Sequence, residues 1–218
     1  MAGRQANHPA RNPLPSRRRI LRHFNEHDAV MAAVIKRIGP LQLQRNGNYF
    51  IVLCKSIVSQ QISTAAAHTI YLRFHELFQG RSPTPERVLS ASPEALRSAG
   101  LSRQKAAYLH DLSRRFLDRS IRPRQLAYLS NEEIILRLTA VHGIGRWTAE
   151  MFLIFSLNRL AVLPLGDLGL RSAIQKIYSM KALPSPQQLR ALGQRWHPLE
   201  TVATWYCWRL LDDKIVNY

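Results

Sequence analysis

The chain has 218 residues, 46% of them hydrophobic and 21% charged, which is typical of a folded protein with a buried core. Its 31 lysines and arginines against 14 acidic residues give a formal charge of +17, so we expect a polyanionic partner, nucleic acid first. A merely basic surface is the alternative. No apolar run approaches the roughly 18 residues of a membrane span, and the N-terminus lacks the apolar core of a secretory signal. We therefore expect an intracellular protein with no membrane segment.

Residues 1–22 are rich in arginine and proline and contain no acidic residue, which predicts a disordered basic tail before a domain spanning 23–218. Two roles are open for this tail: nonspecific affinity for DNA through counterion release, or no special role. The two cysteines, Cys54 and Cys207, lie in apolar segments and are expected to be buried free thiols. Without a CxxC pair, neither a zinc site nor an iron–sulfur cluster is supported.

Beyond the tail, the chain is punctuated as helices. Val30, Val34 and Ile38 share one helical face, and Gly39-Pro40 ends that helix. The apolar segments 49–60 and 201–211 have the length and character of buried helices. Other helices are expected to start after the caps Ser63, Thr84, Ser92, Ser102, Ser130 and Ser185. Because no alternating strand pattern exceeds a few residues, the fold class is all-α.

The segment LTAVHGIGRWTA, residues 138–149, predicts a helix, a tight glycine turn and a second helix. Gly143 and Gly145 allow the backbone to turn sharply and to approach a ligand. Free N–H groups at the start of the helix near Arg146, with the positive end of its dipole, form an anion site. A DNA phosphate is the natural anion, contacted without regard to base sequence, and the Arg146 side chain would add a charge.

Within this motif, Leu138, Val141 and Ile144 are expected to pack the two helices together, while Thr148 and Ala149 permit their close contact. The string resembles a helix-hairpin-helix motif; an ordinary corner between two helices is the alternative. The expected DNA-binding residues of the hairpin are Gly143, Ile144, Gly145, Arg146 and Thr148.

About twenty residues later, Asp167 follows the apolar segment 162–165 and precedes a new helix. An aspartate at this position is by default a helix N-cap. An ionised carboxylate held there can also stabilise an oxocarbenium-like transition state at a sugar C1′ and position water, as in glycoside hydrolysis. Both roles are compatible, so Asp167 is the candidate catalytic residue.

Several linked motifs within residues 26–211 resemble the helix-hairpin-helix (HhH-GPD) DNA glycosylase superfamily, and within it the DNA-3-methyladenine glycosylase II family in compact form. These motifs are HDAVMAAVIKRIGP, SIVSQQIS, GLSRQKAAYLHDLS, VHGIGRWTAEMFLIFSL, VLPLGDLGLR and RWHPLETVATWYCW. The resemblance implies a two-lobed helical fold with the active-site cleft between the lobes. One lobe would comprise about 23–48 plus 160–218, and the other about 49–159.

The resemblance also implies roles for individual residues. Asp167 would be the essential acid for monofunctional base excision, with the target base flipped out of the duplex. Gln61 would fill the gap that the flipped base leaves; an exposed helix-end amide is the alternative. A monovalent cation, Na⁺ or K⁺, would bind the main-chain carbonyls of Thr139, Val141 and Ile144 and take no part in the chemistry. No cofactor for catalysis is implied.

Bifunctional relatives, similar to endonuclease III, carry a lysine nucleophile just after the hairpin, where this chain has Trp147. Hydrolysis without strand cleavage is therefore expected, and Trp147 offers a stacking surface for a cationic purine, the alternative being a core tryptophan. The family pattern differs at Met151, where some members have tyrosine, and at Leu199-Glu200, where some have an aromatic residue and arginine. Trp147, Met151 and Leu199 are the expected substrate-pocket residues, in a pocket less aromatic than in those relatives.

The sequence thus predicts a monomeric enzyme that hydrolyses the N-glycosidic bond of alkylated purines, 3-methyladenine and 7-methylguanine, in double-stranded DNA and leaves an abasic site. The alternatives are a glycosylase for a mismatched, oxidised or alkylated-pyrimidine base, and a noncatalytic DNA-damage-binding protein of the same fold. The expected location is the cytoplasm or nucleoid of a bacterium, or the nucleus of a eukaryote.

Overall fold

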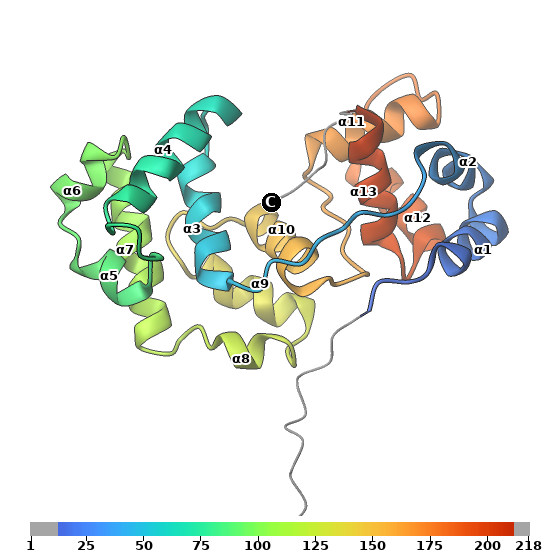
Figure 1. Ribbon diagram of the computed structural model, residues 1–218. Helices are drawn as coiled ribbons and strands as arrows, with labels where there is room; N and C mark the ends of the chain where they lie inside the picture. Colours follow the sequence, from blue (N-terminus) through green and yellow to red (C-terminus); the bar gives the residue numbers. More distant parts are fainter. Residues whose placement is uncertain (1–12, 212–218) are drawn as a thin grey trace, which may run out of the picture. The chain divides into compact units, whose positions relative to one another are not determined.

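The computed structural model describes residues 13–211, and within that range it contains α helices and no strand (Figure 1). The all-α prediction is confirmed. The helices are α1 (Arg17–His27), α2 (Ala29–Ile38), α3 (Tyr49–Ser59), α4 (Thr64–Glu76), α5 (Pro85–Ser90), α6 (Pro93–Ser98), α7 (Arg103–Leu117), α8 (Pro123–Leu126), α9 (Asn131–Thr139), α10 (Arg146–Leu157), α11 (Leu168–Ile177), α12 (Pro186–Trp196) and α13 (Glu200–Leu211).

The helix starts follow the predicted caps. In each case the side-chain oxygen of the cap accepts a hydrogen bond from the main-chain N–H three residues later, which satisfies one of the free donors of the first turn. Ser130 and Ser185 form complete capping boxes with Glu133 and Gln188. The other predicted caps confirmed in this way are Ser63, Thr84, Ser92 and Ser102.

The N-terminal part differs from the prediction in two respects. Helix α1 begins at Arg17, after the cap Ser16, because Ile20 and Phe24 lie four residues apart and are both buried. Part of the predicted tail is therefore helical, and residues 1–12 lie outside the described range. Helix α2 ends at Gly39 as predicted, with φ of 96° at that glycine.

The face shared by Val30, Val34 and Ile38 is not the buried face of α2. Val30 is exposed, and the buried residues of this helix are Met31, Ala32 and Ile35. Helices α1, α11 and α13 all pack against α2, so the covered face is the one that carries Met31 and Ile35. The spacing of Val30, Val34 and Ile38 predicts the helix but not its buried side, because the neighbouring helices decide which side of α2 is covered.

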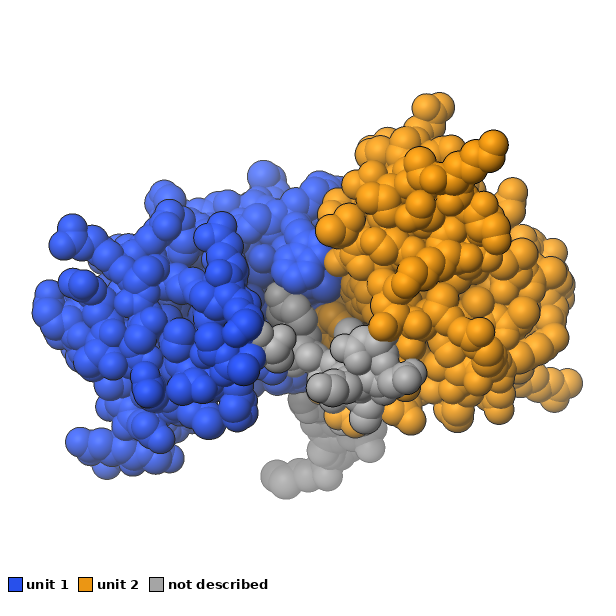
Figure 2. All heavy atoms as spheres, turned by 90° about the horizontal axis from the view of Figure 1, so that it is seen from above, with its two compact units in different colours: residues 1–11, 46–152 blue, residues 12–45, 153–218 orange. Residues whose placement is uncertain are grey.

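The chain divides into two compact units, coloured blue and orange in Figure 2. Among the described residues, unit 1 contains 46–152 and unit 2 contains 13–45 and 153–211. The chain crosses between the units at 45/46 and again inside α10, between Phe152 and Leu153.

In unit 1, α7 is the central helix and packs against α3, α5 and α6. In unit 2, α13 packs against α2, α11 and α12, with Trp205 and Tyr206 fully buried. Cys54 and Cys207 are buried free thiols, as predicted, and burial raises the pKa of both. Between residues 13 and 211, no helix is long and apolar enough to cross a membrane.

Candidate nucleic-acid interface and catalytic carboxylate

The predicted hairpin is present in unit 1, where residues 140–145 join α9 to α10. Gly143 has φ of 83°, and a Cβ added there would collide with the ring of Tyr108. Gly145 is different, because its φ is ordinary and a Cβ added there would meet no described atom within 4 Å. Gly143 is therefore required by the turn itself. Gly145 leaves open space at the start of α10, where a ligand backbone could approach.

The apolar residues of the hairpin pack as their spacing predicts. Leu138, Val141 and Ile144 are all buried, and Thr148 and Ala149 are buried on the facing side of α10. Ile144 and Thr148 are thus able to contact a ligand only through their main-chain atoms. No acidic residue occupies the first turn of α10, so the positive end of its dipole favours an anion.

Arg146 is engaged with two acidic side chains. Its Nη1 donates to Oε2 of Glu132 at 3.0 Å, and its Nε donates to Oε1 of Glu150 at 3.1 Å. The hydrogen bond from Arg146 lowers the pKa of Glu132. These two acidic side chains therefore compensate most of the positive charge of Arg146, which is expected from the sequence to contact DNA. A DNA phosphate would compete with Glu132 for the guanidinium.

Trp147 is 43% exposed, whereas Met151, one turn later on α10, is 2% exposed. An indole with this much exposed surface is not a core residue, and it offers a face for stacking. Met151 contributes to the packing around α10. Of these two predicted pocket residues, only Trp147 presents a substantial accessible surface.

Gln61 lies in the turn between α3 and α4, and its side chain is exposed. Its φ is 56°, a left-handed conformation that costs a non-glycine residue about 1 kcal/mol or more. Such conformations occur where the surroundings impose them, often at functional sites. Exposure and an imposed backbone conformation are what a residue inserted into DNA requires.

In unit 2, Asp167 is the N-cap of α11, as the sequence predicts. Its Oδ1 accepts hydrogen bonds from the main-chain N–H of Leu170 at 2.6 Å and from the indole Nε1 of Trp208 at 3.0 Å. The side chain is largely buried, with the residue 8% exposed. Two N–H donors and the positive end of α11 together stabilise a negative charge on this carboxylate.

Trp208 and Gly169 lie beside Asp167, and Phe155 stacks on Trp208; sequence reasoning missed all three. The rings of Trp208 and Phe155 are stacked, with centroids 5.9 Å apart and planes 18° from parallel. A Cβ added at Gly169 would lie 3.2 Å from Oδ1 of Asp167 and 3.5 Å from Trp208. The second glycine of GDLG therefore leaves room mainly for the carboxylate oxygen of Asp167, and this glycine is the signal that the sequence offered.

The segment that leads to Asp167 is anchored to the start of α13. The hydroxyl of Thr201 donates to the carbonyl of Arg159 at 2.6 Å and accepts from the N–H of Val162 at 3.2 Å. The N–H of Thr201 donates to the carbonyl of Leu160 at 2.8 Å. Fixed at three points, this segment holds Asp167 in place against α13.

Leu199, the third predicted pocket residue, is 2% exposed and lies in the turn before α13. It lines a small cavity whose other walls come from Pro198 and from Arg19, Arg22, His23 and Glu26 of α1. None of the other predicted site residues lines that cavity.

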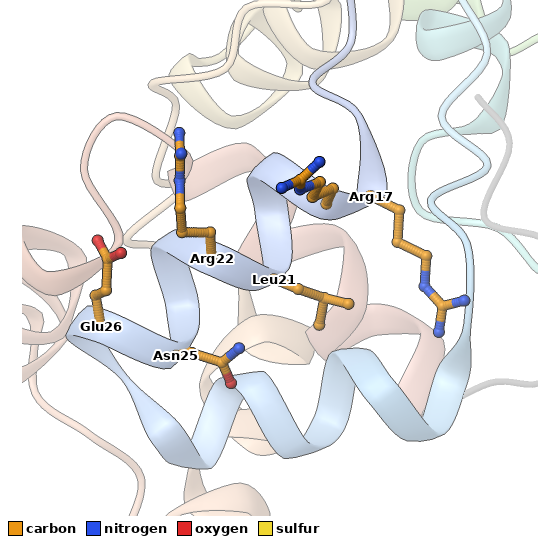
Figure 3. A pocket seen from close by; sticks show the side chains of 6 residues that line it. Arg17, Leu21, Arg22, Asn25 and Glu26 are labelled. Atoms are coloured by element: carbon orange, nitrogen blue, oxygen red, sulfur yellow. The ribbon is translucent and has the colours of Figure 1, made fainter.

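A second, shallow hollow lies on α1 and is lined by Arg17, Arg18, Leu21, Arg22, Asn25 and Glu26. Figure 3 shows Arg17 and Arg22 extending away from one another, with Leu21 between them. This hollow contains none of the predicted catalytic or hairpin residues. Its arginines are the described part of the basic segment that the sequence assigns to a tail.

The predicted cation ligands, the carbonyls of Thr139, Val141 and Ile144, belong to one turn of unit 1. The Val141 carbonyl accepts the N–H of Ile144 at 3.1 Å, and a carbonyl oxygen has a second lone pair that a cation can use. Over residues 13–211, His, Cys, Asp and Glu side chains form no cluster of three or more that could hold a metal ion.

The sequence and the structure were compared with known proteins, and the comparison identifies a protein family. The model of the HhH-GPD superfamily of base excision DNA repair proteins matches residues 54–198. The chain is similar to DNA-3-methyladenine glycosylase 1 of Schizosaccharomyces pombe, with 32% identity over 201 residues that cover 90% of this chain and 87% of the relative.

Solved structures show the same likeness. DNA-3-methyladenine glycosidase from Bacillus halodurans superposes with a TM-score of 0.81 at 35% identity, covering 89% of this chain and 88% of that one. The 3-methyladenine DNA glycosylase of Schizosaccharomyces pombe, solved in complex with abasic DNA, gives a TM-score of 0.77 at 32% identity, covering 88% and 95%.

Proposed function

This chain belongs to the HhH-GPD superfamily of base excision DNA repair proteins, and on that premise we propose that it is a monofunctional DNA glycosylase that excises alkylated purines from double-stranded DNA. Relatives that share about a third of its residues over most of its length are named 3-methyladenine DNA glycosylases. The observation that carries the proposal is the buried carboxylate of Asp167, held by two N–H donors at a helix start.

The chemistry follows from the charge on the substrate. A methyl group at N3 of adenine or N7 of guanine makes the base cationic, so it leaves without protonation. As the bond from C1′ to the base breaks, both bonding electrons depart with the base, which becomes neutral, and positive charge develops on the sugar. The carboxylate of Asp167 stabilises that charge. Water adds its oxygen to C1′ and releases a proton, so the products are a free base and an abasic site.

The remaining candidates bind and orient the DNA. The turn at Gly143 and Gly145 and the first N–H groups of α10 would hold a phosphate. Gln61 would fill the space of the flipped nucleotide, and the exposed indole of Trp147 would stack on a cationic purine. Trp147 also supports hydrolysis over strand cleavage, because it occupies the position of the lysine that forms a Schiff base in bifunctional relatives.

Three further expectations belong to the proposal. A monovalent cation at the carbonyls of Thr139, Val141 and Ile144 would add positive charge at the phosphate site without entering the reaction. The protein would act as a monomer, because one chain supplies both the hairpin and Asp167. Its substrate would place it with the nucleoid of a bacterium or in the nucleus of a eukaryote.

The decisive experiment is to incubate the protein with methylated duplex DNA and to separate released bases by chromatography. We expect release of 3-methyladenine and 7-methylguanine without strand cleavage. Asp167→Asn retains the acceptor oxygen for Leu170 and Trp208 but loses the charge. It should therefore fold and bind DNA while losing at least about a hundredfold in rate. Full activity in this variant would exclude Asp167 as the catalytic residue.

The same assay separates the alternatives. Release only from duplexes with mismatched bases, oxidised bases or alkylated pyrimidines would assign a different lesion. Binding to damaged DNA without release of any base would assign a noncatalytic damage-binding protein.

A further inference from the structure

Helix α7, which begins within the sequence GLSRQKAAYLHDLS, contacts two separate turns of unit 1 through one row of side chains. Lys105, Tyr108 and Asp111 are three residues apart and share a face of the helix. Lys105 reaches the end of α3, while Tyr108 lies against Gly143 and Asp111 binds His142. The proposed function gives no role to these three side chains. Both turns that they contact, however, contain residues to which it assigns contacts with DNA.

The contact of Lys105 is the most specific of the three. Its Nζ donates to the carbonyl of Val58 and to the carbonyl of Gln60, both at 2.7 Å. The last carbonyls of a helix lack internal partners and form the negative end of its dipole. Helix α3 has no basic residue in its last turn, so a lysine from α7 supplies the positive charge instead. Burial lowers the pKa of Lys105, which shows that the ammonium is partly removed from water.

Gln60 is consequently held through both its main chain and its side chain. Its carbonyl is bound by Lys105, and its side-chain Nε2 donates to the carbonyl of Gly143 at 2.7 Å. The next residue, Gln61, has the exposed side chain and the left-handed backbone conformation. A residue with φ of 56° keeps that conformation only if its neighbours impose it. Here the neighbour is Gln60, held between α7 and the hairpin.

We infer that Lys105 is a positioning residue for base flipping: its ammonium fixes Gln60, thereby sets the backbone of Gln61, and couples the Gln61 turn to the hairpin turn through Gln60 and Gly143. This inference rests on the proposed function, since it gives Gln61 the role of filling the vacated space. Lys105 itself touches neither the base nor the reacting sugar.

The test compares Lys105→Met, which keeps the length of the side chain but removes all donors, with Lys36→Met as a matched control. Lys36 is an exposed residue of α2 in unit 2, so its loss removes one positive charge and nothing else. Two measurements are made on each variant: the single-turnover excision rate on methylated duplex, and the fluorescence of 2-aminopurine placed beside a stable abasic analogue. The second reports insertion of a side chain into the stack and needs no catalysis.

We expect Lys105→Met to lose about tenfold to a hundredfold in excision rate and most of the fluorescence rise, while its affinity for undamaged duplex matches that of Lys36→Met. Combined with Gln61→Ala, it should lose little beyond Gln61→Ala alone, because the two residues act as a unit. A merely structural role would give additive losses. Additive losses, or a Lys105→Met protein equal to the control, would overturn the inference.

Two further variants keep the test decisive if Lys105→Met does not fold. Lys105→Arg retains donors for the two carbonyls and should preserve insertion, whereas Gln60→Ala removes the link to Gly143 and should reproduce the loss. Gln60→Ala with a normal fluorescence rise would overturn the inference. If the unsubstituted protein releases no methylated base, the proposed function fails, yet the fluorescence comparison still decides the role of Lys105. An unsubstituted protein without any fluorescence rise would refute the inference as well.

Discussion

The indole Nε1 of Trp208 donates a hydrogen bond to Oδ1 of Asp167 over 3.0 Å, across 41 residues of sequence. The same oxygen accepts the N–H of Leu170. The carboxylate is thus oriented by a main-chain donor and a side-chain donor, and a neighbouring aromatic ring holds the indole in place. A carboxylate with its orientation fixed in this way acts on a developing charge without first reorganising.

Trp208→Phe tests this contact. Phenylalanine keeps a ring to stack on Phe155 but removes the N–H donor. A hydrogen bond to a charged group is worth about 1.5–3 kcal/mol, so the excision rate should fall about tenfold to a hundredfold. Single-turnover kinetics on methylated DNA measures the rate, and a DNA-binding assay provides the control. Unchanged kinetics in a folded variant would mean that the hydrogen bond from Trp208 is not needed to orient Asp167.

The two hairpin glycines should respond differently to alanine. Gly143→Ala places a Cβ against Tyr108 at a φ of 83°, so we expect a loss of about 2–4 kcal/mol in the free energy of unfolding. Gly145→Ala meets no described atom within 4 Å and should leave that free energy nearly unchanged. Its Cβ would instead obstruct the DNA backbone and lower affinity about tenfold, the value of one charge-assisted hydrogen bond.

Denaturant unfolding and DNA titration together check this pair of variants. Equal stability losses in both would contradict the assignment of Gly143 to the turn. Unchanged DNA affinity in Gly145→Ala would show that the space beside this glycine is not a backbone contact.

Glu132→Gln should strengthen DNA binding, because it weakens the compensation of Arg146 by an acidic partner. Weakening one of the two acidic contacts of Arg146, with Glu150 retained, should steepen the slope of log affinity against log salt by up to about one unit. Affinity measured over a series of salt concentrations gives this slope. A slope equal to that of the unsubstituted protein would place Arg146 outside the contact with phosphate.

The hairpin turn should also show a defined response to acid. Burial by itself raises the pKa of Asp111, but the hydrogen bonds from the main chain and ring of His142, with the charge of Arg115, more than offset it, and the pKa lies below its ordinary 3.8. Because the folded-state pKa is the lower one, this carboxylate stabilises the fold above about pH 4 and loses that effect as the pH falls through the folded-state pKa.

Asp111→Asn should therefore be less stable than the unsubstituted protein near neutral pH, and the difference should shrink at strongly acidic pH. Urea unfolding of both proteins at a series of pH values measures it. A stability difference that stays constant down to the lowest pH would mean that the charge of Asp111 does not contribute.

Much of the fold and part of the site follow from local sequence signals. Ser130 with Glu133, or Ser185 with Gln188, specifies a helix start within four residues of chain, so no tertiary information is needed. The hairpin and the Asp167 cap are local in the same sense. Helix α1 was not predicted, because a run of arginines conceals the spacing of Ile20 and Phe24 and residues up to 22 were assigned to the tail.

Contacts between distant segments could not be predicted in this way. Trp208 was one of several tryptophans at helical spacing, and only the packing of α13 separates it from the buried Trp196 and Trp205. The role of Lys105 has no local signal, because the carbonyls that it binds lie in a distant segment of the chain. The burial of Met151 and Leu199 likewise depends on which helices cover them.

The exposure of Trp147 has a spectroscopic consequence. The chain contains four tryptophans, of which Trp147 is 43% exposed while Trp196 and Trp205 are 0% and 1% exposed. An indole in water emits at longer wavelength than one in a core, so the red edge of the emission spectrum belongs mainly to Trp147. Acrylamide quenching at that edge would follow the covering of this ring by a purine in real time. Under the proposed stacking role of Trp147, the protein therefore contains a natural optical probe for the occupancy of its site.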